Sequence, residues 1–148
     1  MLIRPATAAD VPAIMDLANS APSAAQWSAE QYHQIFTNPP PRRMVLVIEE
    51  QSALQAFLVG HVLNPEWEVE NIVVANSSRR QGLGKQLLDE FVKVSRREGA
   101  RTILLEVRES NSAARKLYEK CGFVESGRRQ RYYKQPEEDA ILYELFPG

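Results

Sequence analysis

The fold is decided by the stretch RRQGLG at residues 79–84, which joins an apolar segment to an amphipathic one. Backbone N–H groups at the start of a helix have no partner inside the helix, and the helix dipole favours negative charge there. Gly82 and Gly84 let a bulky anion approach the backbone closely, because they carry no Cβ. The stretch therefore predicts a binding site for a phosphorylated ligand at a helix N-terminus.

Two common phosphate-binding loops do not fit these residues. The P-loop ends in Gly-Lys-Ser/Thr, but Gly84-Lys85 is followed by Gln86, so no hydroxyl is available to hold Mg²⁺. The dinucleotide fingerprint Gly-x-Gly-x-x-Gly would need a glycine where the chain has Leu87. That fingerprint also belongs at the first strand of a βαβ unit, whereas residues 79–84 lie in the middle of the chain.

A second stretch, NSAARKLYEKCGF at residues 111–123, narrows the identity of the ligand. It fits the pattern Asn-x-x-Ala-x-x-Leu-Tyr-x-x-x-Gly-Phe, and residues 79–84 fit Arg/Gln-x-x-Gly-x-Gly/Ala. Together and in this order, the two patterns resemble those of the GNAT family of N-acetyltransferases. Taken alone, residues 79–84 could also be a glycine turn that begins a helix and binds no ligand. The resemblance implies that acetyl-CoA is the ligand.

Length and composition are compatible with an ordinary globular enzyme. The chain has 148 residues, which is most simply one domain over 1–148, with 44% hydrophobic and 25% charged residues. Its net charge of −1 argues against a nucleic-acid partner, which would require a basic surface. We expect a monomer or a weak dimer.

Cysteine, histidine and hydropathy exclude several other classes of protein. The lone Cys121 excludes an intramolecular disulfide and a zinc site built from cysteines, while His33 and His61 lie far apart in sequence, so we expect no metal. No apolar run approaches the ~20 residues of a membrane span, and the N-terminus lacks the layout of a signal peptide. The expected location is the cytoplasm, with no membrane partner.

The apolar pattern predicts, in order, a strand, two helices, three strands, a helix, a strand, a helix and two strands. Expected strands are 2–4, 44–49, 54–63, 67–75, 102–107, one from 123 onward and 140–146, and expected helices are 83–98, 112–121 and one after each of the caps Thr7-x-x-Asp10 and Ser28-x-x-Gln31. The prolines at 39–41 end the second helix.

The strongest helical pattern covers residues 83–98, where an apolar stripe consists of Leu83, Leu87, Leu88, Phe91 and Val94. By resemblance, the whole order implies the GNAT fold. This is an α/β fold with a mixed, mostly antiparallel sheet that is splayed at its central strands and flanked by helices.

Further stretches resemble one branch of the family, the ribosomal-protein alanine N-acetyltransferases. They are ILLEVRESN at 103–111, GRRQRYY at 127–133, Trp27-Ser28 and the triplet at 138–140. This resemblance implies transfer of acetyl to a protein N-terminal amine, with a ribosomal protein that begins with Ala as the partner. A small-molecule amine or a lysine side chain is the alternative acceptor, and a non-catalytic acyl-CoA-binding module is disfavoured by the presence of a candidate base and acid.

The family resemblance also implies which residues hold acetyl-CoA. The backbone N–H of Val74 would bond the thioester carbonyl, with Ile72 and Val73 in the same stretch. The pyrophosphate would lie on main-chain amides of Arg80, Gln81, Gly82, Leu83, Gly84 and Lys85. The Lys85 side chain either adds charge or is a solvated helix residue. Asn111 would bond the pantetheine arm, or else cap its helix.

Glu106 and Tyr118 are the candidate catalytic residues. Along the expected strand, the side chain of Glu106 points to the opposite face from those of Leu105 and Val107. A general base would need burial in a cleft, because burial raises the pKa of a carboxylate toward the working pH. The alternative is a glutamate that faces solvent. Tyr118 follows the small Ala114 by four residues, so both lie on one helix face. It would protonate the leaving thiolate, or else be a core tyrosine bonded to the backbone.

Acceptor recognition is predicted from two groups of side chains. Glu66, Glu68 and Glu70 alternate along one strand and share a face, which suits a basic peptide but also suits the wet face of a strand. Tyr132 and Tyr133 form a wall over the first residue of the peptide, or are ordinary strand aromatics.

Overall fold

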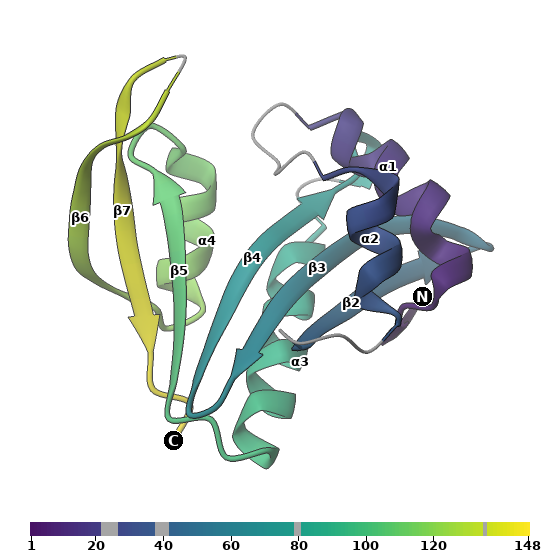
Figure 1. Cartoon of the computed structure of the whole chain (residues 1–148), viewed down its shortest axis with the longest axis horizontal. Coiled ribbons are helices and arrows are strands. Elements are labelled where there is room, and N and C mark those ends of the chain that lie inside the picture. The colour runs from purple at the N-terminus through teal and green to yellow at the C-terminus, as the bar shows by residue number, and fades with distance from the viewer. Residues whose placement is uncertain (22–26, 38–41, 79–80, 135) are drawn as a thin grey trace.

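The computed structural model describes residues 1–21, 27–37, 42–78, 81–134 and 136–148 (Figure 1). Strands and helices follow the predicted order in these residues. They are β1 (Leu2–Pro5), α1 (Val11–Asn19), α2 (Ala29–Ile35), β2 (Arg42–Glu50), β3 (Ala53–Leu63), β4 (Glu66–Val74), α3 (Leu83–Arg97), β5 (Thr102–Arg108), α4 (Ser112–Lys120), β6 (Val124–Tyr133) and β7 (Glu138–Leu145). Short 3-10 turns, Ala8–Asp10 and Asn76–Ser78, precede α1 and follow β4.

One seven-stranded sheet runs through the molecule in the order β1-β2-β3-β4-β5-β7-β6. Neighbouring strands are antiparallel except for β4 and β5, which are parallel. These two strands pair only from Glu66 opposite Thr102 to Val69 opposite Leu105. Beyond that point they diverge, and the sheet opens in a V (Figure 1). The predicted mixed, mostly antiparallel sheet with splayed central strands is therefore confirmed.

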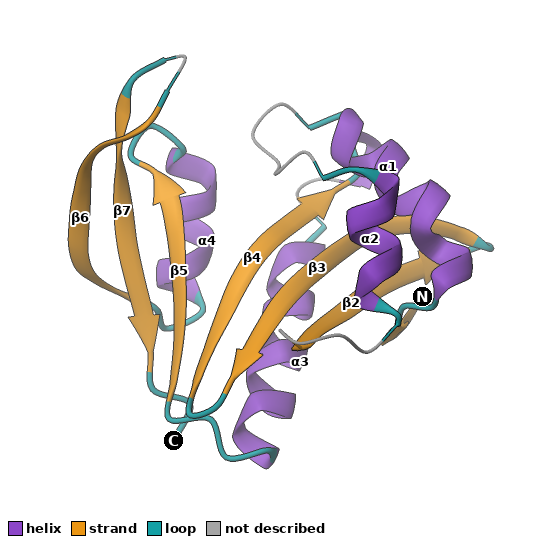
Figure 2. Ribbon diagram, in the orientation of Figure 1, coloured by secondary structure: helices purple, strands orange, loops and turns teal. Residues whose placement is uncertain are grey.

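Helices cover both faces of the sheet (Figure 2). On one face, α1 and α2 pack on β2, β3 and β4 through a cluster that includes Ile14, Tyr32, Val47 and Phe57. On the other face, α3 and α4 bury a larger cluster that draws residues from both sides of the splay. The two halves of the sheet therefore share one apolar layer, although their strands separate.

Two predicted N-terminal caps are present. The Asp10 carboxylate accepts a hydrogen bond from the Thr7 N–H at 2.8 Å. At α2, the Ser28 hydroxyl accepts from the Gln31 N–H at 3.1 Å, and the Gln31 side chain accepts from the Ser28 N–H at 2.7 Å. The reciprocal bonds at Ser28 satisfy amides that α2 itself leaves unpaired, so α2 begins where the sequence indicates. The Thr7 cap instead opens the 3-10 turn Ala8–Asp10, and α1 begins only at Val11.

The buried stripe of α3 differs from the predicted one at its end. Leu83, Leu87 and Phe91 are buried as expected, but Val94 is only half-buried and Ser95 is fully buried in its place. The Ser95 hydroxyl donates to the Val92 carbonyl at 2.8 Å, so it needs no partner outside the helix. A step of four residues from Phe91 follows the 3.6-residue repeat better than the step of three that the apolar pattern favoured.

One predicted strand start differs from the structure, and some predicted features lie outside the residues that the structure describes. β7 begins at Glu138 rather than Ala140, because the hairpin with β6 already pairs Tyr133 with Glu138. The prolines at 39–41 and Arg80 lie outside the described residues. In the described ranges, no helix is long and apolar enough to cross a bilayer.

Candidate active site

Backbone N–H groups of β4 face the gap that the divergence of β4 and β5 creates. The Ala75 N–H donates to the Gln55 carbonyl of β3 at 2.8 Å, and Val74 lies opposite Ala56. N–H directions alternate along an antiparallel strand. The amides of Val74 and Ile72 therefore point away from β3, and the amide of Val73 points toward it.

This alternation refines the prediction for the thioester. Ile72 and Val74 each offer an N–H that no described strand uses, so both are candidate donors to a thioester carbonyl. Val73 is engaged with Phe57 of β3 in the register, and its side chain is buried among α1 and α2. A contact between Val73 and the ligand remains a prediction. The Val73 N–H points toward β3 and is therefore not a candidate donor to the thioester.

The turn before α3 has the geometry of an anion site. Gly82 is the N-cap of α3 and adopts a left-handed conformation with φ of 77°. Its carbonyl accepts from the Gln86 N–H at 3.0 Å, while its lack of a side chain leaves the first amides of the helix without a cap. Those amides belong to Leu83, Gly84 and Lys85 and are unpaired within the helix. They are the groups predicted to bind pyrophosphate, and Gln81 is exposed beside them.

Gly84 and Lys85, whose amides are among these groups, also have structural roles of their own. Gly84 lies against α4, where an added Cβ would come within 3.0 Å of the Leu117 side chain. Lys85 forms an ion pair with Asp89 at 2.7 Å one turn along the helix. This contact raises the pKa of Lys85 and keeps its charge on α3, as the solvated alternative supposed.

Asn111 caps α4. Its side-chain oxygen accepts from the Ala114 N–H at 3.2 Å, which is the alternative role considered for this residue. The side-chain NH₂ group is not used in this cap. A contact between that group and pantetheine remains a prediction.

Tyr118 is buried on the inner face of α4, with 6% of its surface exposed. Its ring lies 6.1 Å from that of Phe123 and 6.2 Å from that of Tyr143, measured between centroids. Burial raises the pKa of the phenol well above its ordinary value, so the group is neutral at physiological pH. No described residue hydrogen-bonds the hydroxyl, in contrast to the core-tyrosine alternative.

Glu106 lies on the opposite face of β5 from the core residues Leu105 and Val107, as the alternation predicted. Its side chain is 27% exposed and its Oε1 lies 3.1 Å from Nε of Arg129 on β6. The candidate base is therefore ion-paired and partly exposed. Sequence analysis did not single out Arg129 as a partner, because only the order of strands in the sheet, with β7 between β5 and β6, brings Arg129 within reach of Glu106.

Two more glutamates lie beside Glu106, and together Glu68, Glu70 and Glu106 form what we call the acidic face. The register between β3 and β4 shifts at Glu70, so strict alternation along β4 does not hold there. Arg43 of β2 binds Glu70 through two hydrogen bonds of 2.8 and 3.1 Å. Glu66, the third predicted acidic residue of this strand, is exposed at the strand start.

The aromatic residues of β6 lie beside the acidic face. Tyr132 and Tyr133 meet edge to face, with centroids 5.2 Å apart. Arg129 lies over the Tyr132 ring at 5.4 Å, and Arg108 over the Tyr133 ring at 4.3 Å. Burial raises the pKa of Tyr133, and the nearby Glu106 adds to the effect. Arg108 of β5 and Arg129, which pairs with Glu106, thus connect the two rings to the strand of the candidate base. Their role as a wall over the peptide remains a prediction.

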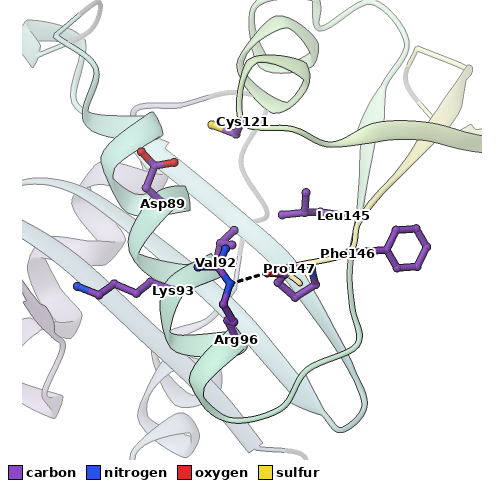
Figure 3. Close-up of a pocket in the computed structure, with 8 residues that line it drawn as sticks. All are labelled: Asp89, Val92, Lys93, Arg96, Cys121, Leu145, Phe146 and Pro147. Carbon is purple, nitrogen blue, oxygen red and sulfur yellow. Dashed lines mark hydrogen bonds between the residues drawn. The ribbon is translucent and has the colours of Figure 1, made fainter.

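A pocket of about 250 Å³ lies elsewhere, between α3, the end of α4 and the C-terminal residues (Figure 3). Arg96 donates from Nε to the Pro147 carbonyl across it. Its lining contains none of the predicted site residues; it consists of Asp89, Val92, Lys93, Arg96, Cys121, Leu145, Phe146 and Pro147. The candidate active site is instead the open gap between β4 and β5 with the acidic face beside it.

Known proteins share both the sequence and this architecture. The sequence model of the acetyltransferase (GNAT) family matches residues 11–123. A ribosomal protein bS18-alanine N-acetyltransferase from Salmonella typhimurium is 36% identical over 138 residues, which cover 92% of this chain and 90% of that protein.

Solved structures of other acetyltransferases have the same fold. The ribosomal-protein-S18-alanine N-acetyltransferase from Escherichia coli has a TM-score of 0.86 and 30% identity, and the match covers 99% of this chain and 94% of the other. An acetyltransferase from Salmonella typhimurium, solved with its cofactor acetyl-CoA, has a TM-score of 0.86 at 20% identity; 100% of this chain and 94% of that chain are covered. From the splayed sheet, the uncapped amides of α3 and these matches, we conclude that the chain belongs to the acetyltransferase (GNAT) family and is an acetyl-CoA-dependent N-acetyltransferase.

Proposed function

We propose that the protein transfers acetyl from acetyl-CoA to the N-terminal amine of a ribosomal protein that begins with alanine. The observation that carries the proposal is the 36% identity, over 92% of the chain, to an enzyme named for alanine acetylation of ribosomal protein bS18. A ribosomal acceptor places the reaction in the cytoplasm.

The charges around the site suit a basic acceptor peptide. The acidic face lies beside the gap between β4 and β5. A hollow of about 390 Å³ by the β6–β7 hairpin is lined by Glu109, Ser110, Arg131, Glu137, Glu138 and Asp139. Negative surfaces raise the rate at which a basic peptide arrives and favour it over acidic ones.

Acetyl-CoA supplies the acetyl group and the thiolate leaving group. Its pyrophosphate lies on the first amides of α3, and its thioester carbonyl accepts hydrogen bonds from Ile72 and Val74. Those N–H groups stabilise the negative charge that develops on the oxygen when nitrogen attacks the carbonyl carbon.

Proton transfers use Glu106 and Tyr118. Glu106 takes a proton from the acceptor ammonium, which leaves a lone pair on nitrogen for the attack. The C–S bond then breaks with its electron pair on sulfur, and the Tyr118 hydroxyl gives its proton to that thiolate. The phenolate regains a proton from the new amide nitrogen. An α-amino group, with a pKa of ~7.7–8.0, needs less help from the base than lysine with ~10.4.

Mass spectrometry of three acceptor types tests the proposal. One peptide carries a free N-terminal Ala followed by basic residues, the second has a blocked N-terminus and one internal Lys, and the third type is a panel of small amines. We expect acetylation of the first peptide alone. Labelling of only the lysine peptide or only the small amines would contradict the proposed acceptor and leave the family assignment intact.

A further inference from the structure

The ladder of β6 and β7 does not hold the end of their hairpin by itself. A register shift interrupts the ladder after Arg129, and pairing resumes only at Tyr133. Arg131, within the shift, has a left-handed φ of 51°. We call residues 130–134, 136 and 137 the hairpin tip. Because the ladder is broken beside the tip, contacts from other elements are needed to fix its position.

Glu138, the first residue of β7, connects the base of the tip to the end of β5. Its carboxylate accepts a hydrogen bond from the Ser110 N–H at 3.1 Å and another from the Ser110 hydroxyl at 2.8 Å. The Arg108 guanidinium lies 3.9 Å from the same carboxylate, whose side chain is only 14% exposed. Glu138 therefore contacts both the last residue of β5 and the loop that follows it.

Arg108 holds the tip directly. Its guanidinium donates to the Pro136 carbonyl at 3.2 Å and to the Lys134 carbonyl at 3.4 Å, and it lies over the Tyr133 ring at 4.3 Å. The ion pair with Glu138 favours this orientation of the guanidinium. Arg108 follows Glu106 by two residues on β5, so both project from one face of the strand. The tip is thus attached to the face of β5 that carries the candidate base.

The Glu138 carboxylate is charged at neutral pH. The Ser110 N–H and hydroxyl lower its pKa, and the charge of Arg108 lowers it further against the opposing effect of burial. Hydrogen bonds to a charged carboxylate are stronger than those between neutral groups. The contact between β7 and the loop after β5 is therefore fully formed at physiological pH.

The acidic neighbours of Glu138 make a different kind of contact. Glu137 pairs with Arg131 at 3.3 Å, inside the tip itself. The Asp139 carboxylate accepts from the Arg128 side chain at 2.6 Å and from the Arg131 N–H at 2.9 Å, and both of these donors belong to β6. Of these three carboxylates, Glu138 is thus the one that ties the hairpin to β5 and its loop through the bonds of the described residues.

We propose that Glu138 is a positioning residue, which fixes the hairpin tip through Ser110 and Arg108 so that Tyr132 and Tyr133 border the path of the acceptor. The inference rests on the proposed function in taking the acceptor to be a peptide that these two rings contact. A shift of about 1 Å in a group that positions a substrate is enough to reduce the rate strongly. The amides of β4 and α3 that are proposed to bind acetyl-CoA lie outside this contact.

Steady-state kinetics with a peptide that begins with Ala test the inference. In Glu138→Ala, the KM for the peptide should rise by about tenfold, because the tip is no longer held in place. The kcat and the KM for acetyl-CoA should change by about twofold or less. Glu138→Gln keeps an oxygen that can accept from Ser110, so it should recover part of the loss. A general loss of structure would not separate the two substrates in this way.

Glu137→Ala is the charge-matched control. Glu137 and Glu138 line the same hollow, so each alanine variant removes one negative charge from it. The Glu137 variant therefore measures the effect of charge on a basic peptide. Glu138→Ala should raise the peptide KM about fivefold more than Glu137→Ala does. This difference should persist at high salt, which screens the effect of charge alone. Equal KM values in the two variants would contradict the inference.

A double-mutant cycle tests whether Glu138 acts through Ser110. Ser110→Ala removes the hydroxyl without changing the charge, and it should raise the peptide KM less than Glu138→Ala, because the Ser110 N–H remains. Added to Glu138→Ala, it should have little further effect. Additive effects would rule out this route. If thermal melts and acetyl-CoA affinity show that Glu138→Ala is not folded, Glu138→Gln and Ser110→Ala decide, and a wild-type KM in both overturns the inference.

Amide exchange separates the inference from the proposed acceptor, because it needs no acceptor. The Arg131 amide donates to Asp139 and should exchange faster in Glu138→Ala than in wild type. An unchanged rate overturns the inference, and so does faster exchange with a wild-type KM for the peptide. If the tip loosens but wild type acetylates only lysine or small amines, the proposed acceptor is wrong and the role of Glu138 in anchoring the hairpin stands.

Discussion

In the proposed mechanism, individual side chains carry the chemistry, and their burial and their partners suit them to it. Tyr118 is enclosed by two aromatic rings, whereas Glu106 is held by a guanidinium. A neutral phenol is the form that a general acid requires before reaction. The assignment of these two roles can be tested by changes that preserve packing.

Replacement of Tyr118 by Phe removes only the hydroxyl. No described residue bonds this hydroxyl, so the thermal midpoint should change little. If Tyr118 protonates the thiolate, kcat should fall by about 10²-fold or more, in the range for a lost general acid. Steady-state kinetics and thermal melts on the same preparations provide the check. Tyr143→Phe is the control, because its hydroxyl donates to Glu119 on α4 at 2.7 Å and is bonded by Arg115.

The two variants should show opposite patterns. Tyr143→Phe should lower the thermal midpoint with a smaller effect on kcat, since it breaks contacts between β7 and α4. An unchanged kcat in Tyr118→Phe would rule out its role as the acid.

In the proposed binding mode, strands and helix ends position acetyl-CoA through their main chain. The divergence of β4 from β5 frees two amides, and the left-handed Gly82 opens α3 without a cap. Side chains contribute little to either feature, which is why the pattern of glycines and apolar residues was sufficient to locate them.

Gly82 and Gly99 form a matched pair for testing the turn. Both have positive φ, 77° and 84°, and a Cβ at either would meet no atom within 4 Å. Substitution by Ala should therefore cost about the same stability at each, roughly 1 kcal/mol, through backbone strain alone. Only Gly82→Ala should weaken acetyl-CoA binding, because Gly99 lies past the far end of α3. Calorimetric titration and urea unfolding measure the two effects; equal affinities would contradict the placement of the pyrophosphate.

Amide hydrogen exchange tests the β4 edge. Without ligand, the amides of Ile72 and Val74 should exchange faster than that of Val73, which points toward β3. Acetyl-CoA should slow exchange at Ile72 or Val74 and leave Val73 nearly unchanged. Site-resolved exchange by NMR gives the comparison, and protection confined to Val73 would show that the thioester binds elsewhere.

The molecule as a whole depends on the helix layer that bridges the splay. β4 and β5 share few backbone pairs, but α3 and α4 bury residues from both halves in one cluster, including Leu46, Trp67, Ile103 and Tyr143. The cluster predicts that the halves unfold together. The single domain over 1–148 remains a prediction that this behaviour would support.

Urea unfolding monitored by tryptophan fluorescence and by far-UV circular dichroism should give one coincident transition. Trp67 is fully buried in the shared cluster and reports on it directly. Two separated transitions would mean that β5, β6 and β7 open independently of the rest.

Local patterns were enough to predict the order of elements, the capping boxes at Thr7 and Ser28, the glycine turn that opens α3 and the side of β5 on which Glu106 lies. These features depend on neighbours within a few residues, through periodicity, capping bonds and glycine conformation. The early start of β7 depended on its pairing with β6. The burial of Ser95 in place of Val94 follows the helical repeat, and the apolar pattern missed it because serine is polar.

Only the tertiary structure decided which charges meet. Arg43 and Glu70 are far apart in sequence, as are Arg129 and Glu106, and both pairs form through strand register. The shift of the β3–β4 register at Glu70 also interrupts the alternation of Glu66, Glu68 and Glu70 that the sequence predicts. Sequence determined the order of elements and the glycine turn before α3, because both rest on local backbone geometry. The partners of each carboxylate, and the lack of one for Glu68 among the described residues, follow from long-range pairing that no local pattern encodes.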